Sequence, residues 1–183
     1  MKVLQLARVV MVPSMLIAGS LFALSAMAAP TRGWGTIAME GAIVETACAI
    51  DVGSQDQTVD MGVVPLGQIV RDGRGNTRPF TIQLVDCQLS APTPAAPEWR
   101  YFQVTFDGPA DQGLFAVNGD SRGIALRITD SRGNVARPGD RMPPGNIVPG
   151  SMGLNYFLDV MGNHEVLRAG AYQSTVRFKL NYY

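Results

Sequence analysis

The sequence predicts an all-β protein built as an antiparallel β-sandwich. Three observations carry this prediction. The apolar runs are short and alternate apolar with polar residues, which is the period of a half-buried strand. Pairs of turn-forming residues such as Asp107-Gly108 separate the runs. After residue 28, no stretch keeps a helical period of 3.6 residues over three turns.

Composition excludes several classes of protein. The chain has 183 residues, of which 46% are hydrophobic and 16% charged, so it can bury the core of one ordinary domain and is not a disordered chain. Its 15 basic and 15 acidic residues balance, so we expect no nucleic-acid partner. His164 is the single histidine, which leaves little material for a histidine-based metal or catalytic centre.

The first 28 residues have the pattern of a signal peptide. Lys2 and Arg8 precede an uncharged stretch, and Ala26-Met27-Ala28 provides the small-x-small pattern that signal peptidase cleaves. We therefore predict a signal peptide over 1–28 and a mature chain that starts at Ala29. A membrane anchor is the alternative, since an uncharged stretch of this length could just span a bilayer. Pro13 and the missing basic stop-transfer flank favour cleavage and export.

The mature chain contains a succession of alternating runs with turns between them. In the run over 80–85, Phe80, Ile82 and Leu84 share one face. The predicted strands are 36–44, 80–85, 101–106, 123–129, 154–161 and 175–182. The predicted turns are Asp72-Gly73, Gly75-Asn76, Asp107-Gly108, Asn118-Gly119, Arg132-Gly133-Asn134, Pro138-Gly139 and the hairpin tip at Gly162-Asn163.

Cys48 and Cys87 are the only cysteines. In an exported chain an even number of cysteines predicts disulfides, and two allow a single pairing. Closing this loop should stabilise the fold by about 4 kcal/mol in the chain-entropy model. The wide spacing argues against a CxxC redox or zinc site.

No group of residues predicts an enzyme, a cofactor or a metal site. Gly73-Arg74-Gly75 lacks the helix and the Lys-Ser/Thr pair of a phosphate-binding loop. His164 and Glu165 follow the predicted hairpin tip, where polar residues are solvated. The spacing of Asp107, Asp111 and Asp120 does not fit an EF-hand.

The pattern of cysteine, glycine and terminal residues resembles that of bacterial chaperone–usher pilins. An alternating segment over 39–48 contains Gly41, and Cys48 follows it by seven positions. The segments 57–62 and 80–87 resemble the strand that ends in glycine and the strand that leads to the second cysteine. Phe178, Leu180 and the penultimate Tyr182 match the C-terminal motif of such subunits.

This resemblance implies an incomplete immunoglobulin-like sandwich that a donor strand from another subunit completes. Residues 29–43 would form the donor-strand extension and residues 44–183 the pilin domain. An open sheet edge invites an added strand from another chain, and one donor and one acceptor per subunit assemble head to tail into a fibre. The expected donor side chains are Ile37, Met39 and Ile43, with Gly41 where the groove is shallow. The expected residues of the strand beside the acceptor groove are Val176, Phe178, Leu180 and Tyr182.

The resemblance also implies partners and a location. A periplasmic chaperone and an outer-membrane usher would handle the subunit before it joins other pilins at the cell surface. The 155 residues after the signal peptide leave no room for an adhesin's lectin domain. The content of Arg, Met and Pro favours a minor or terminating subunit, and a major shaft subunit is the alternative. A self-complete secreted sandwich that binds carbohydrate through Trp34 or Trp99 is a second alternative.

Overall fold

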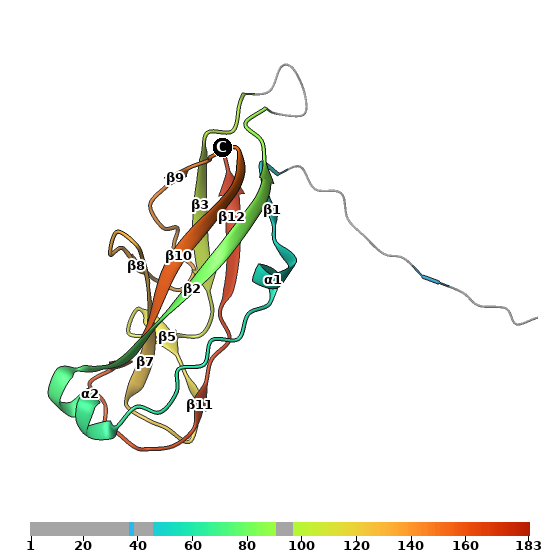
Figure 1. Cartoon of the computed structure of the whole chain (residues 1–183). Coiled ribbons are helices and arrows are strands. Elements are labelled where there is room, and N and C mark those ends of the chain that lie inside the picture. The colour runs from blue at the N-terminus through green and yellow to red at the C-terminus, as the bar shows by residue number, and fades with distance from the viewer. Residues whose placement is uncertain (1–36, 39–45, 91–96) are drawn as a thin grey trace, which may run out of the picture. The chain divides into compact units, whose positions relative to one another are not determined.

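The computed structural model describes residues 37–38, 46–90 and 97–183. All of these except Ile37 and Ala38 belong to one unit of the chain. Its elements, in chain order, are β1 (Ala49–Ile50), α1 (Val52–Gln55), α2 (Leu66–Asp72), β2 (Arg74–Cys87), β3 (Tyr101–Asp107), β4 (Ala110–Asp111), β5 (Leu114–Ala116), β6 (Asn118–Gly119), β7 (Ile124–Asp130), β8 (Val135–Ala136), β9 (Gly145–Asn146), β10 (Gly150–Gly162), β11 (Tyr172–Gln173) and β12 (Arg177–Tyr182) (Figure 1).

The strands form two principal antiparallel sheets that pack into an immunoglobulin-like sandwich, as the sequence predicts. Among the described residues, the larger sheet has the order β1-β2-β10-β7-β5-β4, with β8 beside β7. The smaller sheet has the order β12-β3-β9, and β11 and β6 form a separate two-stranded sheet. The long strands β2, β10 and β7 form the centre of the larger sheet, with Leu158 of β10 opposite Arg78 of β2 and Ile128 of β7.

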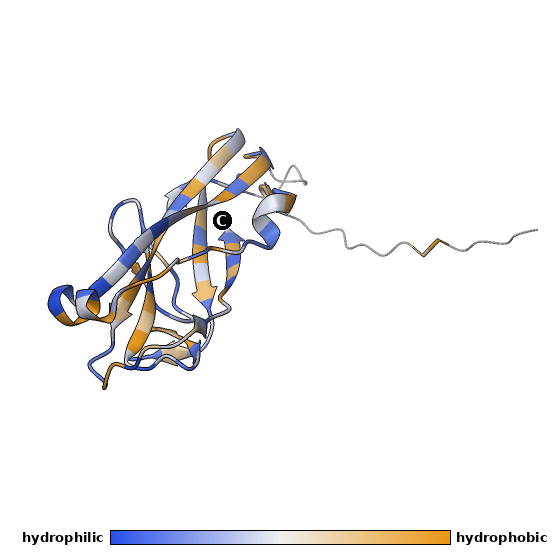
Figure 2. Ribbon diagram, turned by 60° about the horizontal axis from the view of Figure 1, so that its bottom comes forward, coloured by the Kyte–Doolittle hydropathy of each residue, from blue (hydrophilic) through white to orange (hydrophobic). Residues whose placement is uncertain are grey.

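The core lies between the sheets and is filled by alternate residues of the long strands. Apolar and polar residues alternate along these strands (Figure 2). Ile82, Leu84 and Val160 of the larger sheet are completely buried. The ring of Phe106 in β3 meets that of Tyr156 in β10 edge to face, with centroids 5.0 Å apart. Aromatic contacts of this geometry add to the free energy of apolar burial and hold the two sheets together.

Most of the predicted strands are present. The strands predicted at 101–106, 123–129, 154–161 and 175–182 correspond to β3, β7, β10 and β12. The run predicted at 80–85 is the second half of β2. The run predicted at 36–44 lies largely outside the described residues.

Three local predictions are wrong. Asn118-Gly119 is not a turn but forms strand β6, because its backbone pairs with Tyr172 and Gln173 of β11. Gly75-Asn76 is not a turn but lies inside β2, because Gly75 provides space for a neighbour. A Cβ atom on Gly75 would lie 2.6 Å from Cγ1 of Val64.

Gly162-Asn163 is not the tip of a hairpin, because β10 pairs with β2 and β7 whereas the next strand, β11, pairs with β6. Asn163 is also not solvated, since only 6% of it is exposed. Its side-chain amide donates a hydrogen bond of 2.6 Å to the Asp111 carboxylate, which satisfies the buried amide.

Candidate functional site

A groove of about 1320 Å³ is the main cavity that the described residues line. Its first wall is formed by residues 54–64, and its second wall by residues 167–178. Its floor consists of core side chains from both sheets, namely Phe80, Ile82, Phe106, Leu126, Ile128 and Val160. The floor is therefore apolar, and charged residues such as Asp60 and Arg168 lie on the walls.

The first wall has an unpaired backbone. Among the described residues, no backbone–backbone hydrogen bond joins residues 56–64 to another segment. Long side chains hold this wall instead. The Asn76 amide donates to the carbonyls of Met61 and Val63 at 3.3 Å, and Gln57 donates to the carbonyl of Thr81 at 2.9 Å. The carbonyls of Met61 and Val63 and the N–H of Gly62, which donates to the Asp60 carboxylate, thus have side-chain partners. The wall is an extended segment without a neighbouring strand among the described residues, so its other backbone groups can pair with an added strand.

The lower second wall, which we define as residues 167–173, is held by backbone hydrogen bonds. Asp120 N–H donates to the carbonyl of Ala171 at 2.9 Å, and Arg122 and Arg168 exchange two bonds of 3.1 Å. Gly119 makes this close approach possible. A Cβ atom there would lie 2.3 Å from the Ala171 oxygen, and the backbone φ of +133° also favours glycine.

The upper part of the second wall leads into β12, which is the last strand of its sheet. One edge of β12 pairs with β3, from Arg177 opposite Asp107 to Tyr182 opposite Phe102. Its other edge pairs with no strand among the described residues. Among the described residues, the groove is thus bounded by the first wall on one side and, where the second wall enters β12, by a strand edge that has no neighbour. Open edges of this kind are where another strand can add.

The predicted residues of the strand beside the groove share one face of the chain's last segment. Val176 and Phe178 line the groove. Leu180 and Tyr182 lie further along β12 and pack against the core. The Tyr182 hydroxyl donates to the carbonyl of Cys48 at 3.4 Å, and burial raises the pKa of Tyr182 to about 12. The C-terminal strand is therefore fastened to the segment that bears the first cysteine.

The predicted disulfide between Cys48 and Cys87 is confirmed, and both residues are buried. It joins the start of the described unit to the end of β2. The Gln88 N–H also donates to the carbonyl of Ala47 at 2.8 Å beside it. The disulfide and this hydrogen bond thus hold Ala47 and Cys48 at the end of β2.

The predicted donor residues are not tested by the structure. Ile37 is described, and 84% of it is exposed to solvent. Met39, Gly41 and Ile43 lie outside the described residues. The assignment of these four residues to a donor strand therefore stays a prediction.

Neither the lower second wall nor Tyr172 within it was predicted from the sequence. Residues 167–173 have no alternating pattern, so no periodic signal pointed to them. The hydroxyl of Tyr172 is the one buried side-chain polar atom that has no hydrogen-bond partner among the described residues. Burial, and secondarily the negative charge of Asp60, raise the pKa of Tyr172.

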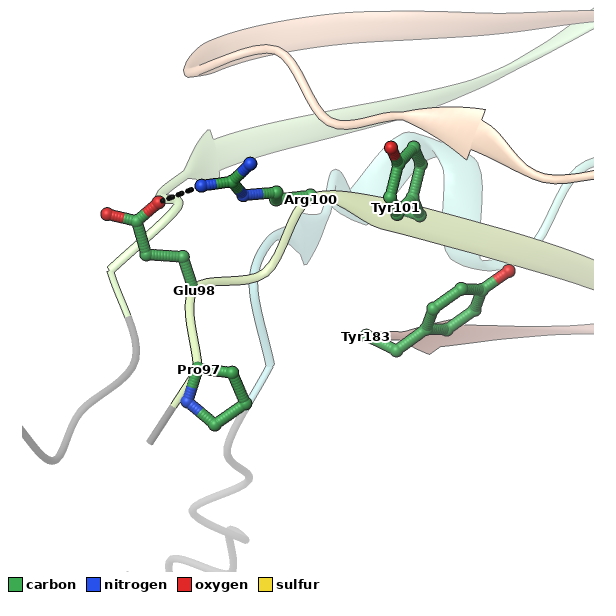
Figure 3. A pocket seen from close by; sticks show the side chains of 5 residues that line it. All are labelled: Pro97, Glu98, Arg100, Tyr101 and Tyr183. Carbon is green, nitrogen blue, oxygen red and sulfur yellow. Dashed lines mark hydrogen bonds and ion pairs between the residues drawn. The ribbon is translucent and has the colours of Figure 1, made fainter. Parts of the chain in front are cut away.

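A second hollow lies near the C-terminus and is shallow. It measures about 430 Å³ and is lined by Pro97, Glu98, Arg100, Tyr101 and Tyr183 (Figure 3). The Arg100–Glu98 ion pair of 3.3 Å is largely exposed, so it contributes little to stability. Trp99 beside it packs against the core, so its indole is not a free platform for a sugar ring.

Other kinds of site find no support in the described part of the chain. No group of three or more metal-binding side chains occurs among those residues. Nor does any helix there have the length and apolar character needed to cross a bilayer. The groove is therefore the candidate functional site.

Comparisons with known proteins agree with this geometry. The family model described as "Fimbrial protein" matches residues 37–182. The PAP fimbrial minor pilin protein of Escherichia coli is 31% identical, over 81% of this chain and 77% of that protein. The major MR/P fimbria protein of Proteus mirabilis is 28% identical, over 89% of this chain and 91% of that protein.

Solved structures show the same fold. The P pilus rod subunit PapA matches with a TM-score of 0.68 at 22% identity, over 75% of this chain and all of that one. The relatives are structural fimbrial proteins rather than enzymes. The chain belongs to the fimbrial protein family, whose members are structural subunits of bacterial surface fimbriae.

Proposed function

We propose that this subunit joins its fimbria by accepting a strand from another subunit in the groove and by donating its own N-terminal extension, residues 29–43, in turn. The observation that carries the proposal is the groove itself. Its floor is core, and among the described residues the first wall and the outer edge of β12 have no neighbouring strand. An added strand would pair with these backbones and place alternate apolar side chains on the floor.

The donor side of the proposal rests on the sequence before Ala47. In an extended strand, Ile37, Met39, Gly41 and Ile43 would share one face, because side chains alternate with a period of two. One donor and one acceptor per subunit give head-to-tail contacts that do not close, and the product is a fibre. The domain proposal follows: residues 1–28 are removed as a signal peptide, and residues 44–183 form the pilin domain. Mass spectrometry of the exported chain should then show Ala29 as its first residue.

Export and assembly require partners that cover the groove before another subunit does. An exposed apolar groove between unpaired edges is an aggregation hazard. We infer that a periplasmic chaperone occupies it first and that an outer-membrane usher exchanges the chaperone for the next subunit. Other pilins are then the permanent partners.

Within the fimbria, we propose a minor or terminating position. Two curated relatives are named minor pilins, at 31% and 30% identity, and the Arg, Met and Pro content also favours this position. The measurement is the number of copies per fimbria, by quantitative mass spectrometry of sheared fimbriae. A few copies per fimbria support the proposal, whereas a majority share would make this chain the shaft subunit.

The donor strand is tested by replacing Gly41 with leucine. If Gly41 faces a shallow part of a partner's groove, the larger side chain overpacks the contact by about 1–3 kcal/mol. Subunit abundance and chaperone binding should be unchanged, while incorporation into sheared fimbriae should be lost. Gly67→Leu is the matched control, because a side chain at Gly67 meets no atom within 4 Å.

Two outcomes would contradict the assignment. Normal incorporation of Gly41→Leu would remove Gly41 from the donor interface. Loss of the folded subunit itself would place Gly41 in the subunit's own fold instead.

A further inference from the structure

Four exposed apolar side chains lie around one end of the groove, and we call them the end patch: Val63, Leu66, Val70 and Val166. Val63 lies at the end of the first wall and is 91% exposed, and Val166 directly precedes the second wall and is 88% exposed. Leu66 and Val70 lie four residues apart on α2, so they share one face of this helix. Leu66 also lines the groove, so the end patch continues the apolar surface of the groove.

The end patch lies opposite the disulfide. The first wall follows β1, which pairs with the last part of β2 beside the disulfide, and it ends at α2. The second wall leads into β12, whose Tyr182 donates to the Cys48 carbonyl. The Gly162 N–H donates to the Gly73 carbonyl at 3.0 Å, which joins the end of α2 to the segment that contains Val166. Both walls therefore run from the disulfide end of this unit to the end patch (Figure 1).

The fold of the subunit itself does not bury the end patch. The helix α2 is held to the body through Ile69, which is buried, and a Cβ atom on Gly162 would lie 3.4 Å from Cγ2 of Ile69. Val70, the next residue, remains 67% exposed. Single exposed apolar residues are common in folded proteins, but a group of them at the mouth of a groove is typical of an interaction surface.

The number of residues before the disulfide places another subunit beside the end patch in the proposed assembly. β12 runs toward the disulfide, so a strand that pairs with it antiparallel, which is the more stable arrangement, ends beside the end patch. Cys48, which the disulfide fixes in the body of the donor subunit, follows the predicted donor residue Ile43 by five residues. Five residues span at most about 18 Å. The disulfide end of the donor subunit is therefore the part that comes closest to the end patch.

The disulfide end offers a surface that suits apolar side chains. The rings of Tyr101 and Tyr183 lie there with their centroids 6.2 Å apart, each nearly half exposed, in the hollow that Pro97 also lines (Figure 3). The charges of Glu98 and Arg100 in the same hollow neutralise each other in an ion pair. Valine side chains packed on the two rings would remove apolar surface of both subunits from water.

We propose that the end patch is a second interface between subunits, which packs against the disulfide end of the subunit whose extension fills the groove. This inference rests on the proposed function, since the extension in the groove brings the two bodies together. The partner is a fimbrial subunit that presents aromatic side chains beside its first cysteine, and a second copy of this chain meets that description. Contact between the folded bodies then adds to the affinity of the strand.

The experiment offers the groove a strand with and without a folded body. The acceptor is the exported chain, residues 29–183, refolded in an excess of either donor. The first donor is a synthetic peptide of residues 29–45. The second donor is the exported chain with residues 29–45 repeated after Tyr183 through a flexible linker, so that the repeat fills its own groove and its N-terminal extension stays free. The release of each fluorescently labelled donor into an excess of unlabelled peptide is measured over time.

The acceptor variant carries Val70→Ser together with Val166→Ser. It should release the whole donor about tenfold faster than the wild-type acceptor does, because two valine side chains no longer contribute apolar burial. Release of the peptide should be unchanged. Tyr183→Ser in the whole donor should also speed its release from the wild-type acceptor.

Two control substitutions in the acceptor test whether the effect belongs to the end patch. Val135→Ser is the matched control, because Val135 is 45% exposed on β8 and does not line the groove. It should change neither release rate. Gly67→Leu adds an apolar side chain to α2 where a Cβ atom meets nothing within 4 Å, so it should not speed release.

The outcomes separate the inference from the proposed function. If the peptide does not bind, the proposed function fails, and the inference fails with it. If the peptide binds but the valine variant releases the whole donor at the wild-type rate, the inference is overturned and the proposed function stands. If the variant speeds the release of peptide and whole donor equally, the valines act on the strand alone, and the contact between bodies is wrong.

Discussion

Replacing Arg127 with methionine should destabilise the sandwich strongly, because it leaves a buried carboxylate without its cation. Asp159 of β10 is only 4% exposed, and its Oδ2 accepts two hydrogen bonds from Arg127 of β7, at 2.9 and 3.1 Å. Its Oδ1 accepts a hydrogen bond from the Thr77 hydroxyl of β2. The three side chains therefore connect the three central strands of the larger sheet.

Replacing Arg127 should lower the stability of the fold more than replacing Asp159. Arg127→Met leaves the Asp159 carboxylate with Thr77 as its remaining side-chain donor, and breaking a buried pair in this way costs about 3–5 kcal/mol. Asp159→Asn leaves the Arg127 side chain, which is 28% exposed and can reach water, so the cost falls to about 1–3 kcal/mol. The arginine variant should therefore be the less stable one.

Urea unfolding of the exported chain, followed by circular dichroism at pH 7, measures these differences. The control is Arg100→Met, since the Arg100–Glu98 pair is largely exposed and its loss should change stability by less than about 1 kcal/mol. The double variant Arg127→Met with Asp159→Asn should lose less than the sum of the single losses, because each single variant already breaks the pair. Two results would contradict the prediction: additive losses in the double variant, or a lower free energy of unfolding for Asp159→Asn than for Arg127→Met.

Two further predictions concern covalent and ionic constraints in the same unit. Cys48→Ser should lower the free energy of unfolding by about 4 kcal/mol, because the disulfide closes a loop with a separation of 39 residues. The same urea assay measures this loss. A variant as stable as the oxidised wild type would contradict a structural role for the disulfide. Burial alone would raise the pKa of Asp130, but hydrogen bonds from Asn134 and from the Arg132 N–H outweigh it and lower that pKa. Its carboxylate therefore stabilises the fold at neutral pH, and this contribution is lost as the pH falls below about 4. The thermal midpoint of the wild type should then fall more steeply between pH 7 and pH 3 than that of Asp130→Asn, and equal slopes would show that Asp130 does not contribute.

The strands were predictable from sequence where one of their faces is buried. In β3, for example, Phe102, Val104 and Phe106 are buried and alternate with more exposed residues, so the period of two is visible in the residue types. The disulfide was predictable because two cysteines in an exported chain have one possible pairing. These features depend on local patterns or on simple counting.

The predictions that were wrong or missing have physical causes that a local sequence pattern does not show. Gly75 has the appearance of a turn residue, yet its role depends on Val64, which approaches it from the first wall of the groove. The helix α2 has only seven residues, too few to establish a helical period. The hydroxyl of Tyr172 is buried without a hydrogen-bond partner among the described residues, and that is a property of the fold rather than of the adjacent sequence.

The two walls of the groove differ in how they are held, and this difference has a consequence for strand addition. The first wall is attached through the side chains of Asn76 and Gln57, two of whose hydrogen bonds measure 3.3 Å. The lower second wall is attached through backbone bonds and through Gly119, which cannot carry a side chain there. Side-chain contacts adjust at low cost, whereas close-packed backbone does not. If a strand enters the groove as we propose, we expect the second wall to fix its register and the first wall to adapt to it.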